Sequence, residues 1–422
     1  MIENGTSHAA VGGHGAGTMK VVYLHQYFNT PEMAGGTRSY MMAARLVQAG
    51  HEVHVVTAFR DPSARRGVWQ ARVDGIHIHW IPVSYSNHMG LRQRIRAFAE
   101  FAVKSARVAA SIRGDLVFAT STPLTIALPG IYAAWRLGRP MVFEVRDLWP
   151  ELPMAVGELR NPVLIVLARW LERMAYRHAA RVIALSPGMA EGVIRAGYPR
   201  ERLAIVPNGC DRARFQNVRG GIRDVFPGLR FADSDRLVLY GGTCGRINGV
   251  SYLVRVAGHT AAVAPHVRFL IVGDGAERGL IEGEAEQLGL LNKTVFVCPP
   301  VEKYRMPLVL AGSDVATSLF IDLPEMWNNA ANKFFDALAA GKPVMINYSG
   351  WQADLLRSSG AGIVVPPDDP AKAAAMLVEF LMDSEAVGRA GLAAQRLAAE
   401  EFDIDRLAAR FIQVLEDAAR TA

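Results

Sequence analysis

Asn332, Lys333 and Asp336 stand near the start of ANKFFDALAAGKPV, an apolar stretch that Gly341 and Pro343 bring to an end. A helix that only packs needs none of these three polar residues. An asparagine can cap a helix start, whereas a lysine there opposes the helix dipole by about 0.3–1 kcal/mol unless an anion binds. Because free backbone N–H groups at a helix start also attract anions, the pattern predicts a bound nucleotide diphosphate, with Asp336 accepting hydrogen bonds from a sugar. The alternative is a capped helix with an exposed aspartate.

Asn328 lies upstream of this helix start. At roughly 100° per residue, Asn328, Asn332 and Asp336 drift only slowly around one helical face. Phe335 and Leu338 fall together on a packing face. The spacing therefore predicts one polar face for a ligand and one apolar face for the core.

Two loops that contain glycine follow predicted strands. Gly35 and Gly36 come after KVVYLHQ and precede a helix that starts near Arg38, and Gly242 and Arg246 lie in YGGTCGRINGV. Glycines let backbone N–H groups approach an anion closely, and an arginine can clamp a phosphate. The second loop does not match the dinucleotide pattern G-x-G-x-x-G, which argues against a nicotinamide enzyme. The alternatives are a plain strand–helix turn and a solvated surface arginine.

A charged cluster occupies VFEVRDLWPELP, which begins in a predicted strand and runs past its end. Its members are Glu144, Arg146, Asp147, Trp149 and Glu151. Ligands of open α/β sheets bind beyond the carboxyl ends of the strands, so this cluster is expected on the side of a cleft. A surface ion pair is the alternative.

The remaining chemical candidates are weaker. Asp233 and Asp235 resemble a metal-binding D-x-D pair but precede a strand, so we expect a linker turn. His25 ends the first strand and could reach the cleft, whereas the other histidines in strands are expected to be structural. The sequence contains no G-x-S-x-G, H-E-x-x-H or P-loop motif.

The elements that must position these residues alternate between short β-branched strands and helices, and the alternation occurs twice. Such a pattern predicts an α/β fold with two Rossmann-like, doubly wound domains that face a central cleft. The expected strands are KVVYLHQ, EVHVVTA, IHIHWIP, LVFAT, MVFEVR and RVIALS in the first domain, and RLVLYGG, VRFLIVG, TVFVCP, VATSLF, PVMINY and GIVVPP in the second. The expected divisions are a flexible tail (1–18), the first domain (19–205), a linker (206–224), the second domain (225–402) and a last helix (403–422) that packs back on the first domain.

Charge is unevenly distributed along the 422-residue chain. Basic residues exceed acidic ones by ten in residues 1–200, whereas acidic residues are in excess by four in the rest. The asymmetry suggests an anionic partner for the first half. A helix over LRQRIRAFAEFAVKSARVAASI could lie on an anionic membrane surface, or it could be the solvated face of an ordinary helix. The residues assigned to membrane contact are Arg92, Arg94, Arg96, Lys104 and Arg107.

Composition also indicates the cellular compartment of the protein. No apolar run reaches the roughly 18–20 residues needed to span a bilayer, and the first eighteen residues lack the features of a signal peptide. The three cysteines are far apart and show no metal-type spacing, which favours a reduced compartment. We therefore expect a cytoplasmic protein, peripheral on the inner face of the cytoplasmic membrane, and no nucleic-acid partner.

Taken together, the motifs resemble bacterial GT-B glycosyltransferases of family 4 over nearly all of residues 20–420. GGTRSYMMAARLVQAGHEVHVVTA is similar to the first loop and second strand of that family, and IVPNGCD to its entry to the second domain. FLIVGDGAERGLIE and NKFFDALAAGKPVMINYSG look like its donor-domain signatures. FATSTPLT and EVRDLWPE are similar to the branch that makes O-antigen, capsule and colanic acid repeats, including N-acetylfucosamine transferases.

The resemblance implies an activity. The second domain would bind a nucleoside-diphosphate sugar, with a UDP-sugar favoured, and would need no metal or cofactor. The first domain would bind a polyprenyl-diphosphate-linked sugar at the membrane surface, and transfer would retain the anomeric configuration. In such enzymes the acceptor oxygen attacks on the face from which the diphosphate leaves, and the diphosphate takes the proton. Catalysis is then mostly charge stabilisation and positioning.

The resemblance also assigns roles to residues. Asn332 and Lys333 match the helix start that meets the diphosphate, and Asp336 matches the second acid of the family's Glu-x7-Glu pattern, expected on the ribose. The assigned donor-binding residues are Gly35, Gly36, Gly242, Thr243, Arg246, Asn248, Asn332, Lys333 and Asp336, and the assigned catalytic residues are Arg146, Asp147, Asn328 and Glu325.

The chain departs from the family pattern at several of these positions. The second acid is an aspartate, and the first acid position holds Asn328, with Glu325 close by. Asn248 replaces the usual loop lysine, Arg146 stands where many relatives have histidine, and Ser121 and Thr122 stand where a further histidine is common. Two alternatives therefore stay open, a nucleotide-sugar 2-epimerase and an inactive GT-B scaffold that binds a partner.

Overall fold

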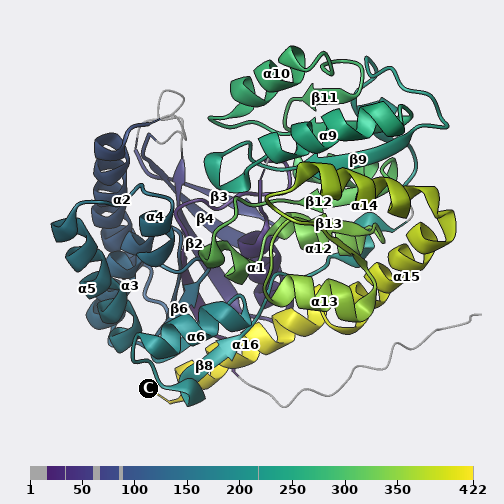
Figure 1. The fold of residues 1–422 in the computed structure, drawn as a ribbon. Helices are drawn as coiled ribbons and strands as arrows, with labels where there is room; N and C mark the ends of the chain where they lie inside the picture. The colour runs from purple at the N-terminus through teal and green to yellow at the C-terminus, as the bar shows by residue number, and fades with distance from the viewer. Residues whose placement is uncertain (1–16, 34, 60–66, 85–88, 217, 422) are drawn as a thin grey trace, which may run out of the picture.

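Two α/β domains make up the part of the chain that this computed structural model describes, which is residues 17–33, 35–59, 67–84, 89–216 and 218–421. The tail expected over 1–18 lies almost entirely outside these residues. Figure 1 shows the first domain in purple to teal beside the second in green to yellow, with the yellow last helix running back beneath the first.

The first domain is built on an eight-stranded sheet in the order β3-β4-β2-β1-β5-β6-β7-β8. Its strands are β1 (Lys20–Leu24), β2 (Glu52–Phe59), β3 (Trp69–Val73), β4 (Ile76–Pro82), β5 (Leu116–Thr120), β6 (Met141–Val145), β7 (Arg181–Ala184) and β8 (Leu203–Ile205). Its helices are α1 (Arg38–Gln48), α2 (Leu91–Ser111), α3 (Ala127–Leu137), α4 (Glu151–Ala155), α5 (Pro162–His178) and α6 (Pro187–Arg195), with 3-10 turns η1 (Leu124–Ile126) and η2 (Arg200–Arg202).

One edge of this sheet departs from the predicted parallel arrangement. β3 runs antiparallel to β4 and pairs Trp69 with Trp80, whereas every other pair is parallel. β3 was not predicted, because WQARV is half-exposed and lacks the continuous β-branched run of a buried strand. The inner strands β5 and β6 are buried throughout, as expected when helices cover both faces.

The linker and the second domain follow the predicted pattern of a second parallel sheet, in the order β11-β10-β9-β12-β13-β14. The strands are β9 (Arg236–Gly241), β10 (Val267–Val272), β11 (Val295–Cys298), β12 (Val315–Ser318), β13 (Val344–Ile346) and β14 (Gly362–Val364). The helices are α7 (Arg212–Phe215), α8 (Ile222–Val225), α9 (Ser251–Val263), α10 (Arg278–Gln287), α11 (Met306–Ala311), α12 (Asn332–Ala339), α13 (Trp351–Ser359), α14 (Pro370–Met382) and α15 (Ser384–Glu400), with 3-10 turns η3 (Arg246–Asn248), η4 (Lys303–Arg305) and η5 (Pro324–Asn328).

The last helix, α16 (Ile404–Arg420), packs on the first domain rather than the second. It buries Phe411 in the first-domain core, where the ring of Phe118 on β5 meets it edge-on at 5.0 Å between centroids. On the way, the chain passes the linker, and the backbone N–H of Cys210 donates to the carbonyl oxygen of Phe402 at 2.7 Å. Two segments of the chain, the linker and the segment that leads into α16, therefore cross between the domains side by side. They limit how far the two domains can move apart.

Candidate active site

Lys333 lies in the first turn of α12 and reaches the end of the second-domain sheet. Its ammonium donates hydrogen bonds to Asn248 Oδ1 (2.8 Å) and Tyr240 OH (3.3 Å), and it lies 4.8 Å from the ring centroids of Tyr240 and Phe320. Burial lowers the pKa of Lys333 to about 7. Among the described residues its hydrogen-bond partners are all neutral, including the carbonyl oxygen of Leu319 at 3.4 Å. This desolvated, unneutralised cation is suited to bind an anionic ligand.

The Gly242 loop lies beside this lysine and packs against the end of β10. A Cβ at Gly273 would lie 1.8 Å from the carbonyl oxygen of Gly242, so only a glycine permits this approach. Tyr240 OH donates to the carbonyl oxygen of Thr243 at 2.8 Å. A Cβ at Gly242 would lie 3.7 Å from Lys333 Cδ. Gly242, Thr243, Asn248 and Lys333 thus come together at the carboxyl end of the sheet.

The start of α12 differs from its prediction in two ways. Asn328 belongs to the separate turn η5, so the continuous polar face expected through Asn328, Asn332 and Asp336 is wrong. Ala331 occupies the N-cap position and no side chain caps the helix, so the expected cap by Asn332 is also wrong. The reason is local, because Asn329 Oδ1 accepts a hydrogen bond from the backbone N–H of Ala331 at 3.2 Å and turns the chain before the helix begins.

Asn332 instead meets the first domain. A Cβ at Gly36 would lie 2.6 Å from Asn332 Nδ2, so the loop after β1 reaches the start of α12. Gly35 has a φ of +117°, which a glycine adopts without strain. Asn29 Nδ2 donates to the carbonyl oxygen of Gly36 at 3.2 Å and holds the loop in place. The two helix starts that the sequence assigns to the diphosphate, those of α1 and α12, therefore approach each other across the domain boundary.

Asp336 lies one turn further along α12 and has a partner that the sequence did not reveal. Its carboxylate forms an ion pair with Lys303, a buried residue at the start of η4. A sugar hydroxyl bound at Asp336 would share the carboxylate with this lysine. The pair joins α12 to the turn η4.

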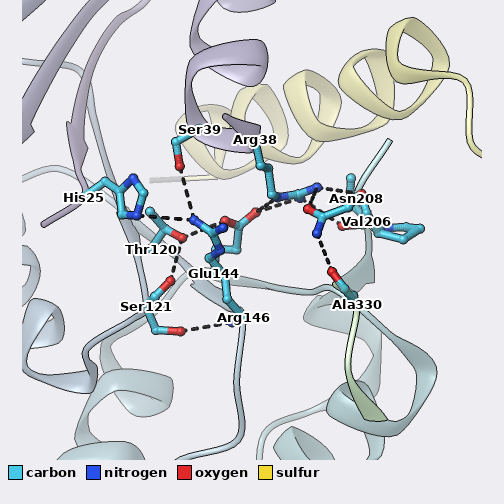
Figure 2. Close-up of polar contacts among 11 residues, drawn as sticks. His25, Arg38, Ser39, Thr120, Ser121, Glu144, Arg146, Val206, Asn208 and Ala330 are labelled. Atoms are coloured by element: carbon cyan, nitrogen blue, oxygen red, sulfur yellow. Dashed lines mark hydrogen bonds and ion pairs between the residues drawn. The ribbon is translucent and has the colours of Figure 1, made fainter. Parts of the chain in front are cut away.

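Arg146 at the end of β6 turns toward the first strand of its own domain. Its Nη1 lies 3.3 Å from His25 Nε2 and 3.5 Å from Ser39 Oγ, and Figure 2 shows the three side chains converging from different elements. The backbone N–H of Arg146 donates to Ser121 Oγ at 3.0 Å. The site thus holds an imidazole beside a guanidinium at the carboxyl ends of β1 and β6.

Glu144 is buried in the first domain, so its expected place on the cleft side is wrong. Its carboxylate accepts hydrogen bonds from Arg38 Nη2 (2.8 Å) and Thr120 Oγ1 (2.6 Å), and neither member of the ion pair is more than 1% exposed. Burial alone would raise the pKa of Glu144, but Arg38 and Arg146 hold it below its ordinary value.

Arg38 also links the first domain to the linker. Its guanidinium donates to the backbone carbonyl oxygens of Val206 (2.9 Å) and Pro207 (2.5 Å). Beside them, Asn208 Nδ2 donates to the carbonyl oxygen of Ala330, close ahead of α12. Figure 2 shows this series of contacts, which connects the first-domain sheet with the helix start that carries Lys333.

Asp147, Glu325 and Asn328 line one pocket of about 240 Å³ between the domains. Asp147 Oδ2 accepts a hydrogen bond from Thr122 Oγ1 at 2.7 Å, and burial raises the pKa of Asp147. Glu325 is exposed at the pocket. A Cβ at Gly188 would lie 1.7 Å from Asn328 Oδ1, so the asparagine side chain is held against α6 of the first domain.

The other assigned residues do not line this pocket. Arg246 is exposed in η3. On α2, Arg94 lies 3.5 Å from Glu158, and Lys104 lies 2.6 Å from Glu100. The remaining α2 residues assigned to membrane contact are exposed, and these are Arg92, Arg96 and Arg107.

Three polar residues of the site, Arg38, Asn208 and Lys303, were not among the assigned residues. Arg38 gave one usable signal, since no other charge occurs in the next six positions of its helix and an isolated charge in such a run is often buried and paired. Asn208, in the sequence PNG, is indistinguishable from an ordinary turn residue.

The GT-B class of fold is defined by two Rossmann-like domains that face each other. This chain has two such domains, joined by a linker and a returning helix, with a pocket between them. Family models match both domains: residues 34–209 match the glycosyl transferase 4-like domain, and residues 235–383 match glycosyl transferases group 1. The protein is therefore a glycosyltransferase of the GT-B fold.

Known relatives agree with this class. The chain is 26% identical over 302 residues (68% of this chain, 73% of the relative) to the putative colanic acid biosynthesis glycosyl transferase WcaI of Escherichia coli K12. It is 25% identical to a GDP-mannose-dependent alpha-mannosyltransferase of Mycobacterium tuberculosis, covering 80% of this chain and 81% of the relative.

Solved structures resemble the whole fold. Anabaena Alr3699/HepE in complex with UDP-glucose aligns with a TM-score of 0.71 at 19% identity, over 94% of this chain and 100% of that chain. Sucrose-phosphate synthase from Thermosynechococcus elongatus aligns with a TM-score of 0.75 at 17% identity, over 96% and 100%. At these identities the similarity establishes the fold and not the substrates.

Proposed function

We propose that the protein transfers a sugar, with retention of configuration, from a UDP-sugar to a lipid-diphosphate-linked saccharide in the synthesis of a bacterial surface polysaccharide. The observation that carries the proposal is the enclosed Lys333 ammonium, whose hydrogen-bond partners among the described residues are neutral, at the start of α12. The neighbour bound to UDP-glucose supports a uridine donor, and the relative named for colanic acid synthesis supports the polysaccharide.

In this proposal the donor diphosphate binds between the two domains. Lys333 and the backbone N–H groups of α12 contact it from one side, and the loop of Gly35 and Gly36 from the other. Arg246 adds a second cation from the facing turn. These groups neutralise the charge that develops on the leaving diphosphate, so the reaction needs no metal ion. Asp336 binds the ribose.

The acceptor enters from the first domain. Its hydroxyl reaches the pocket that Asp147 and Glu325 line, beside the pair formed by Arg146 and His25. The acceptor oxygen bonds to the anomeric carbon on the face that the diphosphate leaves, and the diphosphate takes the hydroxyl proton. The protein residues position the two substrates and stabilise charge. We place the enzyme at the cytoplasmic face of the membrane, where the basic face of α2 would meet anionic lipid.

Thermal-shift titration with UDP, GDP and ADP, followed by turnover assays with a polyprenyl-diphosphate sugar, tests the proposal. UDP at 100-fold its dissociation constant is expected to stabilise the protein by about 2.7 kcal/mol. GDP and ADP should give smaller shifts, and EDTA should leave turnover unchanged. Release of an isomerised nucleotide sugar without acceptor would favour the epimerase alternative, and UDP binding without turnover of any sugar would favour the scaffold.

Gly273→Ala is expected to weaken donor binding about tenfold, equivalent to about 1.4 kcal/mol. The added methyl group would collide with the carbonyl oxygen of Gly242, which belongs to the backbone and cannot rotate away, so the loop must shift from Lys333. Gly279→Ala on α10 is the matched control, because its Cβ would meet nothing within 4 Å. Isothermal titration with UDP compares the two, and equal affinities would remove the Gly242 loop from the donor site.

A further inference from the structure

A groove of about 270 Å³ between α3 and α5 is lined almost entirely by apolar and aromatic side chains. It lies on the outer side of the first domain, and no element of the described chain covers it. Trp135 is 75% exposed and Trp170 is 53% exposed, which is unusual for tryptophan. The residues that line the groove are Leu128, Ile131, Tyr132, Trp135, Trp170, Leu171 and Met174.

The apolar surface continues along α5 beyond the groove. Val163, Val166, Leu167 and Trp170 follow the i, i+3, i+4, i+7 spacing of one helical face, and all four are exposed. α2, which packs against α3, adds two exposed apolar residues of its own, Ile95 and Val103. Figure 1 shows α2, α3 and α5 together on one side of the first domain. A contiguous apolar face of this extent marks an interaction surface.

The exposed charged residues that α3 and α5 themselves contribute are basic. On α5, Arg173 and Arg177 lie within roughly 60° of Trp170 around the helix axis, so the exposed face is apolar in its first half and basic in its second. Arg136 is exposed next to Trp135. α3 and α5 are described in full, and their single acidic residue, Glu172, is buried.

We infer that the α3–α5 groove and the exposed face of α5 form a docking surface for an anionic phospholipid bilayer. Tryptophan and tyrosine partition to the headgroup level of a bilayer, aliphatic side chains enter the acyl boundary, and arginines attract anionic headgroups. None of the described helices is long and apolar enough to cross a membrane. In this arrangement α3 and α5 make the main contact with the bilayer. The helix α2, to which the sequence assigned membrane contact because of its charge, lies at the edge of the surface.

This docking surface would add a membrane contact to the proposed function, and the purpose that we give it rests on that function. The groove belongs to the domain that contributes Asp147 to the pocket between the domains, so docking would hold that pocket near acceptors carried by lipid. The composition also argues against a second copy of this chain as the occupant. A self-complementary contact would bury the arginines of both copies in one interface in which α3 and α5 offer no exposed acidic partner, whereas anionic lipid neutralises them.

Co-sedimentation with vesicles of phosphatidylcholine and phosphatidylglycerol, without any substrate, tests the inference. The wild-type full chain is expected to bind these vesicles and to bind pure phosphatidylcholine more weakly. Trp135→Ser combined with Trp170→Ser should weaken binding at least about tenfold, because two exposed indoles no longer enter the interface. Arg173→Gln combined with Arg177→Gln should reduce binding to the anionic vesicles about 30-fold, because the attraction of two cations to anionic headgroups is lost.

The matched control replaces two exposed apolar residues of the second domain, Val263 (70% exposed) and Leu280 (66% exposed), by serine. It should bind vesicles like the wild type. As a second measurement, brominated lipid should quench the tryptophan fluorescence of the wild type more than that of the variant Trp135→Phe combined with Trp170→Phe. Unchanged vesicle binding of the double serine variant would overturn the inference. So would a concentration-dependent dimer that this variant abolishes.

The experiment separates this inference from the proposed function. If vesicle binding fails while a soluble acceptor analogue is still glycosylated, the docking surface is wrong and the transferase stands. If vesicle binding depends on the two tryptophans but no UDP-sugar is bound or turned over, the docking surface stands and the proposed reaction is wrong.

Discussion

Replacing Lys333 by methionine is expected to lower kcat/KM for the donor about 10²–10³-fold, the usual cost of removing one preorganised charge partner of a transition state. The ammonium contacts Tyr240, Phe320 and Asn248, and its hydrogen-bond partners among the described residues are neutral. An arriving diphosphate therefore meets a partly desolvated cation without an acidic partner. Charge grows on the diphosphate as the glycosidic bond breaks. The loss should therefore appear in kcat as well as in KM.

Lys342→Met is the matched control for this variant. Lys342 follows the same helix, and burial also lowers its pKa, but its ammonium donates to the carbonyl oxygen of Ala311. The control should keep donor turnover within about twofold of the wild type, as expected of a residue away from the diphosphate. Steady-state kinetics with a UDP-sugar compares the two variants, and equal losses would mean that Lys333 stabilises the domain and does not bind the donor.

The pH dependence of donor binding provides an independent test of the role of Lys333. The pKa of Lys333 is about 7 in the free protein, and a bound diphosphate raises it because the anion favours the charged amine. Affinity should thus be full below about pH 7 and should fall as pH rises above that value, by up to tenfold per unit. The Lys333→Met variant should lose this dependence. A wild-type affinity that is flat between pH 6 and 9 would contradict the role of Lys333.

The sequence predicted the parts of the site that lie in single loops after strands. Gly36, Gly242 and Lys333 each occur where a β-branched run gives way to a turn and a helix, and the carboxyl ends of parallel strands meet at one edge. Once the parallel sheet forms, these loops lie together at one edge, and no further sequence signal is needed to predict that they meet. Local spacing misjudged the exact start of α12, because a side-chain turn at Asn329 interrupts the helix. It also placed the buried Glu144 on the cleft side.

The sequence could not predict contacts between distant segments. Arg38 and Glu144 are separated by 106 positions, and Lys303 and Asp336 by 33. Apart from the isolated charge of Arg38, these residues look like surface charges in the sequence, and only the packed structure shows the partner of each one. The exposed apolar face of α5 was missed for the opposite reason. The spacing of Val163, Val166, Leu167 and Trp170 is that of a buried helix face, and nothing local distinguishes a face that meets the core from one left exposed.

Arg38→Met is expected to destabilise the first domain by about 3–5 kcal/mol, because it leaves the carboxylate of Glu144 buried without its guanidinium partner. The backbone carbonyls of Val206 and Pro207 also lose their donor. Calorimetry should record a melting temperature lower by on the order of 10 °C. Arg45→Met on the same helix is the matched control, since its partner Asp405 is exposed and such pairs contribute less than about 1 kcal/mol.

The same substitution should change how stability depends on pH. In the wild type the pKa of Glu144 is held below its ordinary value, so the contribution of this carboxylate is present above that value and is lost as pH falls through the lower folded pKa. In Arg38→Met, burial without the arginine raises the pKa of Glu144, and protonation then relieves the buried charge. The difference in stability between the two proteins should therefore shrink as pH is lowered from 7 to 5. Adding Glu144→Gln to Arg38→Met should recover much of the loss at pH 7, because no unpaired charge remains and Thr120 keeps a partner. A double variant as unstable as the single one would show that the linker carbonyls, and not the buried carboxylate, depend on Arg38.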